Sequence, residues 1–183
     1  MALLTSEQGL LGMQCPDFSL KSVDDQSFSR DDFKNAQALL ITFICNHCPY
    51  VKAIEDRLIA LARSYEQKSV QLVAICSNDA KTYPEDSKEQ LFHRWMQKKY
   101  GFPYLVDEEQ NVARAFKAVC TPEFYLFDQD RRLFYHGRLD DSWREAQNVK
   151  SQDLAQAIEK LISGQNPPEQ QYPSQGCSIK WRE

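Results

Sequence analysis

The chain has 183 residues, of which 42% are hydrophobic and 26% are charged, and its formal net charge is −4 at pH 7. This length fits one domain, because chains usually divide only above about 250–300 residues. The composition shows no basic excess of the kind that nucleic-acid binding needs. No apolar run approaches the ~18 residues of a membrane span, and the start lacks the charged and apolar parts of a secretory leader. We therefore expect a cytoplasmic protein with no nucleic-acid or membrane partner.

The first part of the chain predicts a hairpin followed by a parallel crossover. Residues 18–28 alternate apolar groups around a polar turn at 24–26, which is typical of a β-hairpin. The β-branched run 39–44 predicts a buried strand, apolar residues at three- and four-residue steps predict a helix over 48–67, and a second strand follows at 70–76. Strand, helix and strand in this order indicate an α/β fold.

The second part of the chain predicts a longer series of elements that ends in a polar tail. The expected elements are a helix from the break at 82–87 to about 98, a strand over 102–106, a short helix over 111–117, a hairpin of strands 124–127 and 133–137, and a helix capped by residues 151–153. Gly164 ends this last helix. We expect one domain over residues 1–164 and an ordered C-terminal arm over 165–183, because Ile179 and Trp181 give the arm something to pack.

The most informative motif is Cys45-Asn46-His47-Cys48, which stands where the first buried strand gives way to the helical pattern. Two cysteines three residues apart at a helix start can form a low-strain disulfide. The first helical turn also offers unpaired N–H groups and the positive end of the helix dipole, which favour an anion. We therefore expect Cys45 to be a thiolate nucleophile with a pKa below that of an ordinary thiol, and Cys48 to resolve the mixed disulfide.

The dipeptide between the cysteines should tune the redox couple. A cationic His47 would stabilise the thiolate and therefore the reduced dithiol, which makes the pair a stronger oxidant. The alternative is that His47 only caps the helix or makes a local hydrogen bond.

The other cysteines have less definite roles. Cys76 and Cys15 are expected to be small buried side chains. Cys177 either folds back as an additional resolving thiol or packs as an ordinary cysteine of the tail, and the second interpretation is slightly favoured.

A metal site is a further alternative. Zinc could bind Cys45, Cys48 and His47 together with Cys120 or Cys177, and copper could bind the cysteine pair and His136. Zinc sites usually draw their four ligands from two spaced pairs, and only one such pair is visible. We therefore expect neither a metal nor another cofactor.

Several further motifs accompany the cysteine pair. They are Cys15-Pro16-Asp17-Phe18, Phe102-Pro103-Tyr104-Leu105-Val106-Asp107, Val119-Cys120-Thr121-Pro122-Glu123-Phe124 and Gly176-Cys177-Ser178-Ile179-Lys180-Trp181. With the order of elements, they resemble the thioredoxin-like superfamily from about residue 12 to residue 163. The resemblance is to its redoxin branch, which includes alkyl hydroperoxide reductase/thiol-specific antioxidant proteins, and within that to a bacterial, peroxiredoxin-like subgroup. It implies a central mixed sheet flanked by helices, with an N-terminal hairpin, a helix insertion and a C-terminal arm.

The resemblance also implies a role for the Thr121-Pro122 motif. Pro122 would follow a cis peptide bond, pack against the cysteine pair and shape the groove in which a substrate strand lies. The same placement would bring Cys120 close to Cys45.

The sequence departs from its relatives at two places. Thioredoxins carry a buried aspartate six residues before the first cysteine, where this chain has Leu39, so the base for Cys48 must come from His47 or Glu123. Peroxiredoxins carry a proline four residues before the threonine of Thr-x-x-Cys, where this chain has Ala38. Thr42 is therefore expected to be an ordinary strand residue rather than a peroxide ligand.

These observations favour a thiol-disulfide oxidoreductase of cell redox homeostasis that acts on a protein dithiol or disulfide. Cys45 would attack a disulfide sulfur and Cys48 would resolve the mixed disulfide. The alternative is a thiol-dependent peroxidase with antioxidant activity, in which a hydroperoxide converts Cys45 to a sulfenic acid. A zinc or copper binding module is less favoured. The expected auxiliary residues are Thr42, Thr121, Cys120, Glu123 and Cys177.

Overall fold

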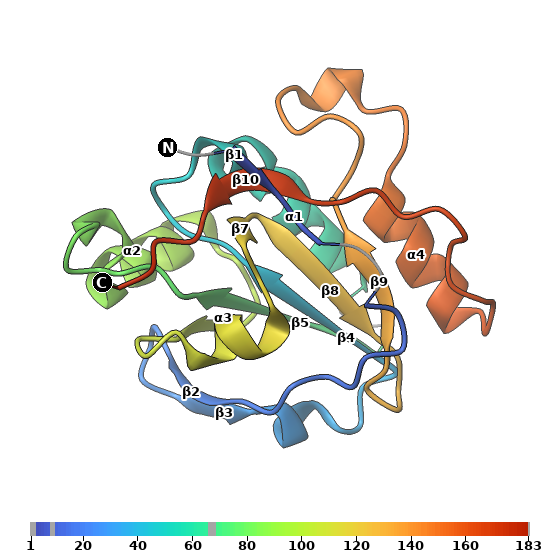
Figure 1. The fold of residues 1–183 in the computed structure, drawn as a ribbon, viewed down its shortest axis with the longest axis horizontal. Helices are drawn as coiled ribbons and strands as arrows, with labels where there is room; N and C mark the ends of the chain where they lie inside the picture. Colours follow the sequence, from blue (N-terminus) through green and yellow to red (C-terminus); the bar gives the residue numbers. More distant parts are fainter. Residues whose placement is uncertain (1–2, 8–9, 66–68, 183) are drawn as a thin grey trace.

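The computed structural model describes residues 3–7, 10–65 and 69–182 as an α/β fold (Figure 1). The strands are β1 (Leu3–Thr5), β2 (Ser19–Ser22), β3 (Ser27–Ser29), β4 (Ala38–Phe43), β5 (Val70–Cys76), β6 (Tyr104–Val106), β7 (Cys120–Thr121), β8 (Glu123–Phe127), β9 (Leu133–Gly137) and β10 (Gln175–Ser178). The α-helices are α1 (Pro49–Tyr65), α2 (Lys88–Lys98), α3 (Asn111–Phe116) and α4 (Asp153–Ile162), and the 3-10 turns are η1 (Arg30–Phe33), η3 (Pro84–Asp86) and η4 (Ala146–Asn148).

The main sheet has the strand order β3-β2-β6-β5-β4-β8-β9 in the described part of the chain. β4 lies near its centre, parallel to β5 and antiparallel to β8, and all six of its residues are buried. Because side chains of a strand alternate between the two faces, Leu40 enters one core and Leu39 and Ile41 enter the other. A strand that is buried on both faces needs the continuous apolar sequence that this segment has.

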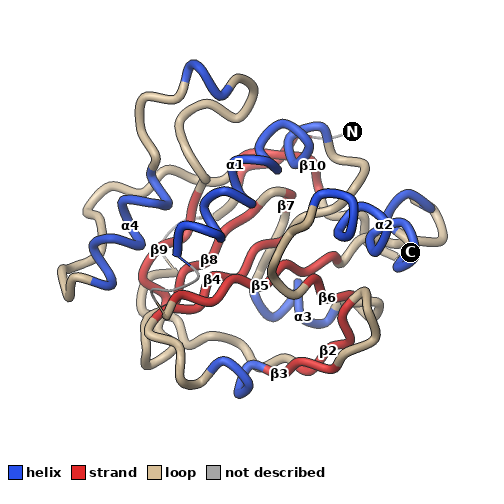
Figure 2. Tube along the Cα trace, turned by 180° about the vertical axis from the view of Figure 1, so that it is seen from behind, coloured by secondary structure: helices blue, strands red, loops and turns tan. Residues whose placement is uncertain are grey.

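Helices cover the two faces of this sheet unequally (Figures 1 and 2). α1, α2 and α4 supply the core on one face, through side chains such as Ile54, Leu91 and Ile158. The other core is filled by Phe33 of η1 and by Phe116 of α3, among others. The cysteine motif stands at the C-terminal end of β4, on the side of α1.

A second, smaller sheet has the order β1-β10-β7. β7 and β8 are separated only by Pro122, so the chain passes from the small sheet into the main sheet at this residue. The Thr121-Pro122 peptide bond is cis, as the resemblance implies. β10 comes from the C-terminal segment and lies between β1 and β7, so residues far apart in sequence meet beside Pro122 (Figure 1).

The α-helices and the strands of the main sheet agree with the sequence-based predictions except at some ends, whereas β1, β7 and β10 of the small sheet were not predicted. β2 and β3 form the expected hairpin, and β8 and β9 form the second one. α1 begins at Pro49 rather than Cys48, because the Cys48 carbonyl already accepts the first helical hydrogen bond, from Lys52 N at 3.1 Å. The predicted end of this helix, at residue 67, lies outside the described residues. β6 starts at Tyr104, after Pro103 rather than at residue 102.

None of the helices in the described part of the chain combines the length and the apolar character that crossing a bilayer requires.

The aromatic centre of the second core should contribute strongly to stability. Phe116 is fully buried and makes edge contacts with Phe43, Tyr125 and Phe127 at ring-centroid distances of 5.5, 5.4 and 6.0 Å. We expect Phe116→Ala to lower the free energy of unfolding by about 3–5 kcal/mol, because it leaves a cavity among these rings. Urea unfolding measures this. Phe92→Ala on the partly buried face of α2 is the control, and an equal loss in both variants would contradict the prediction.

Candidate active site

The two cysteines of the motif are held differently at the start of α1. Cys48 occupies the position just before the helix, and its sulfur accepts the backbone N–H of Val51 in the first turn. Cys45 lies three residues earlier, in the loop that leaves β4. The sulfur nearest the helix N-terminus is therefore that of Cys48, and the prediction that Cys45 holds this position is wrong. The reason is that the helix starts after the motif, at Pro49, rather than within it.

Thr121 joins the cysteine pair to the cis peptide bond. Its hydroxyl Oγ1 lies 3.4 Å from the Cys45 Sγ, and its carbonyl oxygen accepts a hydrogen bond from the Cys48 S–H at 3.1 Å. Cys45 is 2% exposed and Cys48 is 0% exposed. All six cysteines are in the described ranges and each is a reduced thiol. The structure therefore represents the dithiol form of the pair, closed off from solvent by the surrounding chain.

The two thiols ionise unequally. The S–H of Cys45 donates to the Cys48 sulfur, and this hydrogen bond is the largest cause that lowers the pKa of Cys48 to about 5, against the opposing effect of burial. Burial, this donation and the negative charge of Asp86 all raise the pKa of Cys45. The expected low pKa thus belongs to Cys48 in the reduced pair, because Cys48 receives the hydrogen bonds and the helix N–H.

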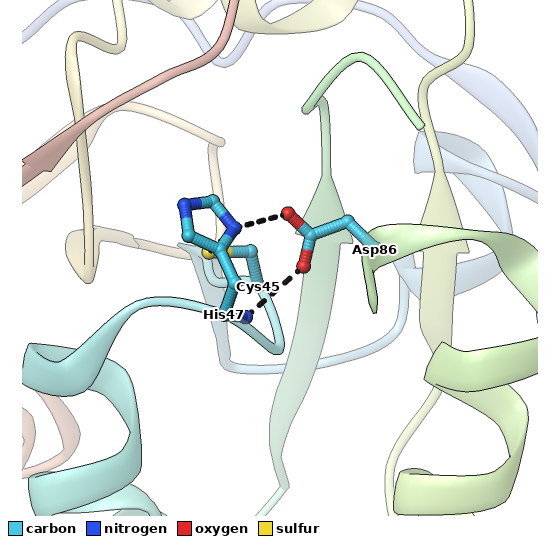
Figure 3. A group of neighbouring side chains, drawn as sticks. All are labelled: Cys45, His47 and Asp86. Carbon is cyan, nitrogen blue, oxygen red and sulfur yellow. Dashed lines mark hydrogen bonds and ion pairs between the residues drawn. The ribbon is translucent and has the colours of Figure 1, made fainter. Parts of the chain in front are cut away.

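His47 lies between Cys45 and a buried carboxylate (Figure 3). Its Nδ1 is 2.5 Å from Oδ2 of Asp86 and 3.8 Å from the Cys45 Sγ, and the ring stacks on Tyr83 with centroids 5.2 Å apart. The side chain of His47 is 10% exposed and that of Asp86 is 0% exposed. The ring therefore forms a rigid contact between the nucleophilic loop and the segment before α2, rather than a local helix cap.

Asp86 is the residue that sequence reasoning missed. Its Oδ1 accepts the backbone N–H groups of Asn46 at 2.7 Å and His47 at 3.2 Å, and its Oδ2 also accepts the Asn78 amide at 2.8 Å. Burial alone would raise the pKa of Asp86, but the hydrogen bonds from His47, Asn78 and Asn46 hold this pKa below its ordinary value. The sequence held a signal for its partner Asn78. Loops that follow neighbouring parallel strands meet at one edge of a sheet, and Asn78 follows β5, which lies beside β4.

The other predicted residues of the cis-proline segment point elsewhere. The Cys120 thiol lies 3.6 Å from Oε2 of Glu123 and not against Cys45, and burial raises its pKa. Glu123 is fully buried and accepts hydrogen bonds from Val119 N, Cys120 N, Tyr125 Oη and His136 Nε2, at 2.6–3.1 Å. Thr42 is buried in β4, and its hydroxyl has no hydrogen-bond partner among the described residues. Thr121, rather than Cys120, is the residue that contacts both cysteines.

Cys177 reaches the same sulfur cluster from the C-terminal segment. It is 2% exposed and forms a hydrogen bond with the Cys48 sulfur, which lowers the pKa of Cys48 further. Burial, assisted by this donation, raises the pKa of Cys177 to about 12. Cys48 is thus the central one of three thiols.

The side chains offer limited support for a metal centre. Among the described residues, the one group of three candidate ligands within 4.8 Å of one another is Cys45, His47 and Asp86. In that group the His47 Nδ1 is already paired with Asp86. His136, the copper ligand considered from the sequence, instead pairs with Glu123 and stacks on Tyr125 with centroids 4.2 Å apart.

A cavity of about 140 Å³ opens beside Pro122. Its lining includes Ile54 of α1, Phe124 of β8 and Trp143, a large apolar side chain that is 39% exposed. The Trp143 ring also packs on Tyr50, with centroids 4.2 Å apart. The surface beside Pro122 is therefore hollow, and its wall combines these apolar side chains with the charged residues Arg138, Asp140 and Asp141.

Known proteins resemble the chain in fold and in sequence. A crystal structure of an uncharacterised conserved protein from Geobacillus kaustophilus is 45% identical with a TM-score of 0.94, and covers 100% of this chain and 97% of its own. A hypothetical protein from Sinorhizobium meliloti is 40% identical with a TM-score of 0.93, over 97% and 98% of the two chains. The thioredoxin domain of a thiol-disulfide oxidoreductase from Bacteroides vulgatus is 15% identical with a TM-score of 0.66, over 85% and 99%, which shows the shared fold.

No curated protein matches the chain. The sequence profile described as the AhpC/TSA family matches residues 11–136, which is more than half of the chain. With the thioredoxin fold described above, this match confirms the expected redoxin branch. The chain belongs to the AhpC/TSA family.

Proposed function

We propose that this protein is a thiol-disulfide oxidoreductase that exchanges disulfides with a protein substrate through Cys45 and Cys48. The observation that carries the proposal is the hydrogen-bonded pair of reduced thiols next to Thr121, with one sulfur at a helix N-terminus. The family membership and the oxidoreductase neighbours of the same fold support it. The cavity beside Pro122 offers a place for an apolar side chain of the substrate.

The shared proton supports a definite order of events. Because the pKa of Cys48 is lowered to about 5, we assign Cys48 as the thiolate at neutral pH and Cys45 as the donating thiol. When a substrate disulfide arrives, the proton passes from Cys45 to Cys48, and the Cys45 sulfur attacks one substrate sulfur. The substrate S–S bond breaks, and its second sulfur leaves with the electron pair and takes up a proton. Cys48 then loses its proton and attacks Cys45, which forms the Cys45–Cys48 disulfide and releases a reduced substrate.

The assignment of Cys45 as the attacking sulfur rests on its position in the loop. Cys48 is capped by Val51 N–H and hydrogen-bonded to the Thr121 carbonyl, whereas Cys45 precedes the helix and lies against the His47 ring and the Thr121 hydroxyl. We also propose that the substrate is a protein dithiol or disulfide. The proposed role is in cell redox homeostasis in the cytoplasm.

The ionisation of the pair predicts a pH dependence. Because the pKa of Cys48 is lowered to about 5 from its ordinary 9.0, the ultraviolet thiolate absorbance of the reduced protein should rise with a midpoint near pH 5. The reduced protein should also lose stability as the pH falls from about 9 towards 5, since the folded state holds the thiolate more favourably than the unfolded chain does. Cys45→Ala should move the midpoint upward, because it removes the S–H donor. Cys76→Ser is the control, and a wild-type midpoint near 9 would contradict the assignment.

The order of attack predicts which variant traps the substrate. Cys48→Ser should accumulate a mixed disulfide between Cys45 and a small disulfide-containing protein such as insulin, and it should lose multiple-turnover reduction. Non-reducing electrophoresis and peptide mapping measure the adduct. Cys45→Ser should trap far less, and Cys76→Ser should behave as the wild type does. If Cys45→Ser traps the substrate and Cys48→Ser does not, the two roles are reversed. If Cys48→Ser forms no adduct and keeps its full turnover, the proposal is wrong.

A second candidate function is thiol peroxidase activity, favoured by the membership in the AhpC/TSA family. Here the Cys45 thiolate would attack a hydroperoxide oxygen, the O–O bond would break, and Cys48 would condense with the sulfenic acid and release water. The unpaired hydroxyl of Thr42 is the donor that could orient the peroxide. Stopped-flow reaction of the reduced protein with hydrogen peroxide tests this candidate. A rate above that of cysteine in solution supports it, and a rate no faster removes it.

A further inference from the structure

The C-terminal segment places a third thiol directly beside the active pair. β10 runs antiparallel to β7, and Cys177 is opposite Thr121 in the register. Residues directly opposite in an antiparallel pair present their side chains on the same face, so the Cys177 thiol lies on the side of Thr121 that meets Cys45 and Cys48. The hydrogen bond between Cys177 and Cys48 agrees with this placement.

Close backbone packing keeps β10 against β7. A Cβ atom at Gly176 would come within 2.0 Å of the Thr121 carbonyl oxygen and 3.2 Å of the Pro122 Cδ, so only glycine permits this approach. The residue before Cys177 is thus adapted to the backbone of the cis-proline segment.

Hydrogen bonds fix the segment on both sides of Cys177. Before it, Ser174 N donates to the Ser6 hydroxyl at 2.9 Å, and the Ser174 hydroxyl donates to the Gly137 carbonyl at 2.5 Å. After it, Ile179 N donates to the Val119 carbonyl at 3.0 Å, and Lys180 N donates to the Asn78 side chain at 2.8 Å. These contacts hold Cys177 at one place relative to Cys48.

The three thiols follow a linear order, with Cys48 in the middle. Cys48 accepts hydrogen bonds from both Cys45 and Cys177. Among the described residues, the three cysteines do not form a group whose sulfur atoms all lie within 4.8 Å. This order brings Cys177 into contact with Cys48, which is the contact that disulfide exchange between them needs. It suits the binding of one metal ion by all three sulfurs poorly.

We infer that Cys177 is a third redox-active thiol, which receives the disulfide from the Cys45–Cys48 pair and forms a Cys48–Cys177 disulfide. This inference rests on the proposed function, which supplies the Cys45–Cys48 disulfide. The Cys177 thiol gives up its proton and its sulfur attacks the Cys48 sulfur. The Cys45–Cys48 bond breaks, and the electron pair leaves with Cys45, which takes up the proton. No further oxidant is needed, because the substrate disulfide has already accepted the two electrons.

The exchange would return Cys45 to its reduced form while the oxidising equivalent stays in the protein. Cys45 could then attack a second disulfide before any reductant acts. The Cys48–Cys177 disulfide would also link α1 covalently to β10, so the C-terminal segment would be tied to the active site only in this oxidised state.

Disulfide mapping of the full chain in graded glutathione redox buffers tests the inference. Samples are quenched with acid, alkylated and digested, and the linked peptides are quantified by mass spectrometry. Wild type should give both Cys45–Cys48 and Cys48–Cys177 bridges, and Cys45→Ser should give the Cys48–Cys177 bridge alone. In Cys45→Ser the further change Cys177→Ser should raise the fraction of Cys48 that carries glutathione by about tenfold, because the resolving thiol is gone.

Cys120→Ser is the matched control, because Cys120 is the neighbour of Thr121 in β7 and its thiol faces Glu123 instead. It should leave both bridges in place. Circular dichroism checks the fold of each variant, and Cys177→Ala serves if Cys177→Ser does not fold.

The outcomes separate the two proposals. A Cys45–Cys48 bridge in wild type with no Cys48–Cys177 bridge in either wild type or Cys45→Ser would overturn the inference and leave the proposed function standing. A Cys45–Cys177 bridge would overturn the linear order. If wild type forms no Cys45–Cys48 bridge at any redox ratio, the proposed function itself fails.

Discussion

The Cys48 sulfur is the point on which the arrangement of the site depends. It receives S–H groups from Cys45 and Cys177 and an N–H group from Val51, and when it is protonated its S–H donates to the Thr121 carbonyl. A buried sulfur anion is costly unless donors surround it. Here the donors come from the motif loop, the first turn of α1 and the C-terminal strand. Three separate parts of the chain must therefore be in place before this thiol can ionise near pH 5.

The same requirement explains the network around Asp86. This carboxylate is buried, so it has to be hydrogen-bonded, and the groups that satisfy it are the backbone of the motif loop, His47 and Asn78. Asn78 also accepts the backbone N–H of Lys180 through its other amide atom. The Asn78 side chain thus contacts both Asp86, which holds the motif loop, and the C-terminal segment that carries Cys177. The loop and the arm are held by a shared polar network rather than independently.

The chain differs from the thioredoxin pattern at the position of the buried base. Leu39 packs in the second hydrophobic core, on the opposite face of β4 from the cysteine pair. Of the two candidate bases, Glu123 has its carboxylate occupied by two backbone N–H groups, Tyr125 and His136, and His47 has its Nδ1 paired with Asp86. In the proposed reaction the proton therefore moves within the sulfur cluster, where the donating thiols already contact Cys48. In this proposal the cluster of three thiols would do what the sequence comparison assigns to a buried aspartate in thioredoxins.

The sequence by itself determined the α/β class, the two hairpins and the order of the elements that build the main sheet, because these follow from local periodicity. It singled out Cys45 and Cys48 through a motif of four residues. It also indicated Thr121 and Pro122 through the resemblance. Tertiary structure alone decided that Cys48, rather than Cys45, receives the helix N–H, since the helix begins one residue after the motif. It also decided that Asp86 supports His47 and that Cys177 reaches Cys48. These contacts join residues 39 to 129 positions apart, and no local pattern in the sequence records which side chains meet over such separations.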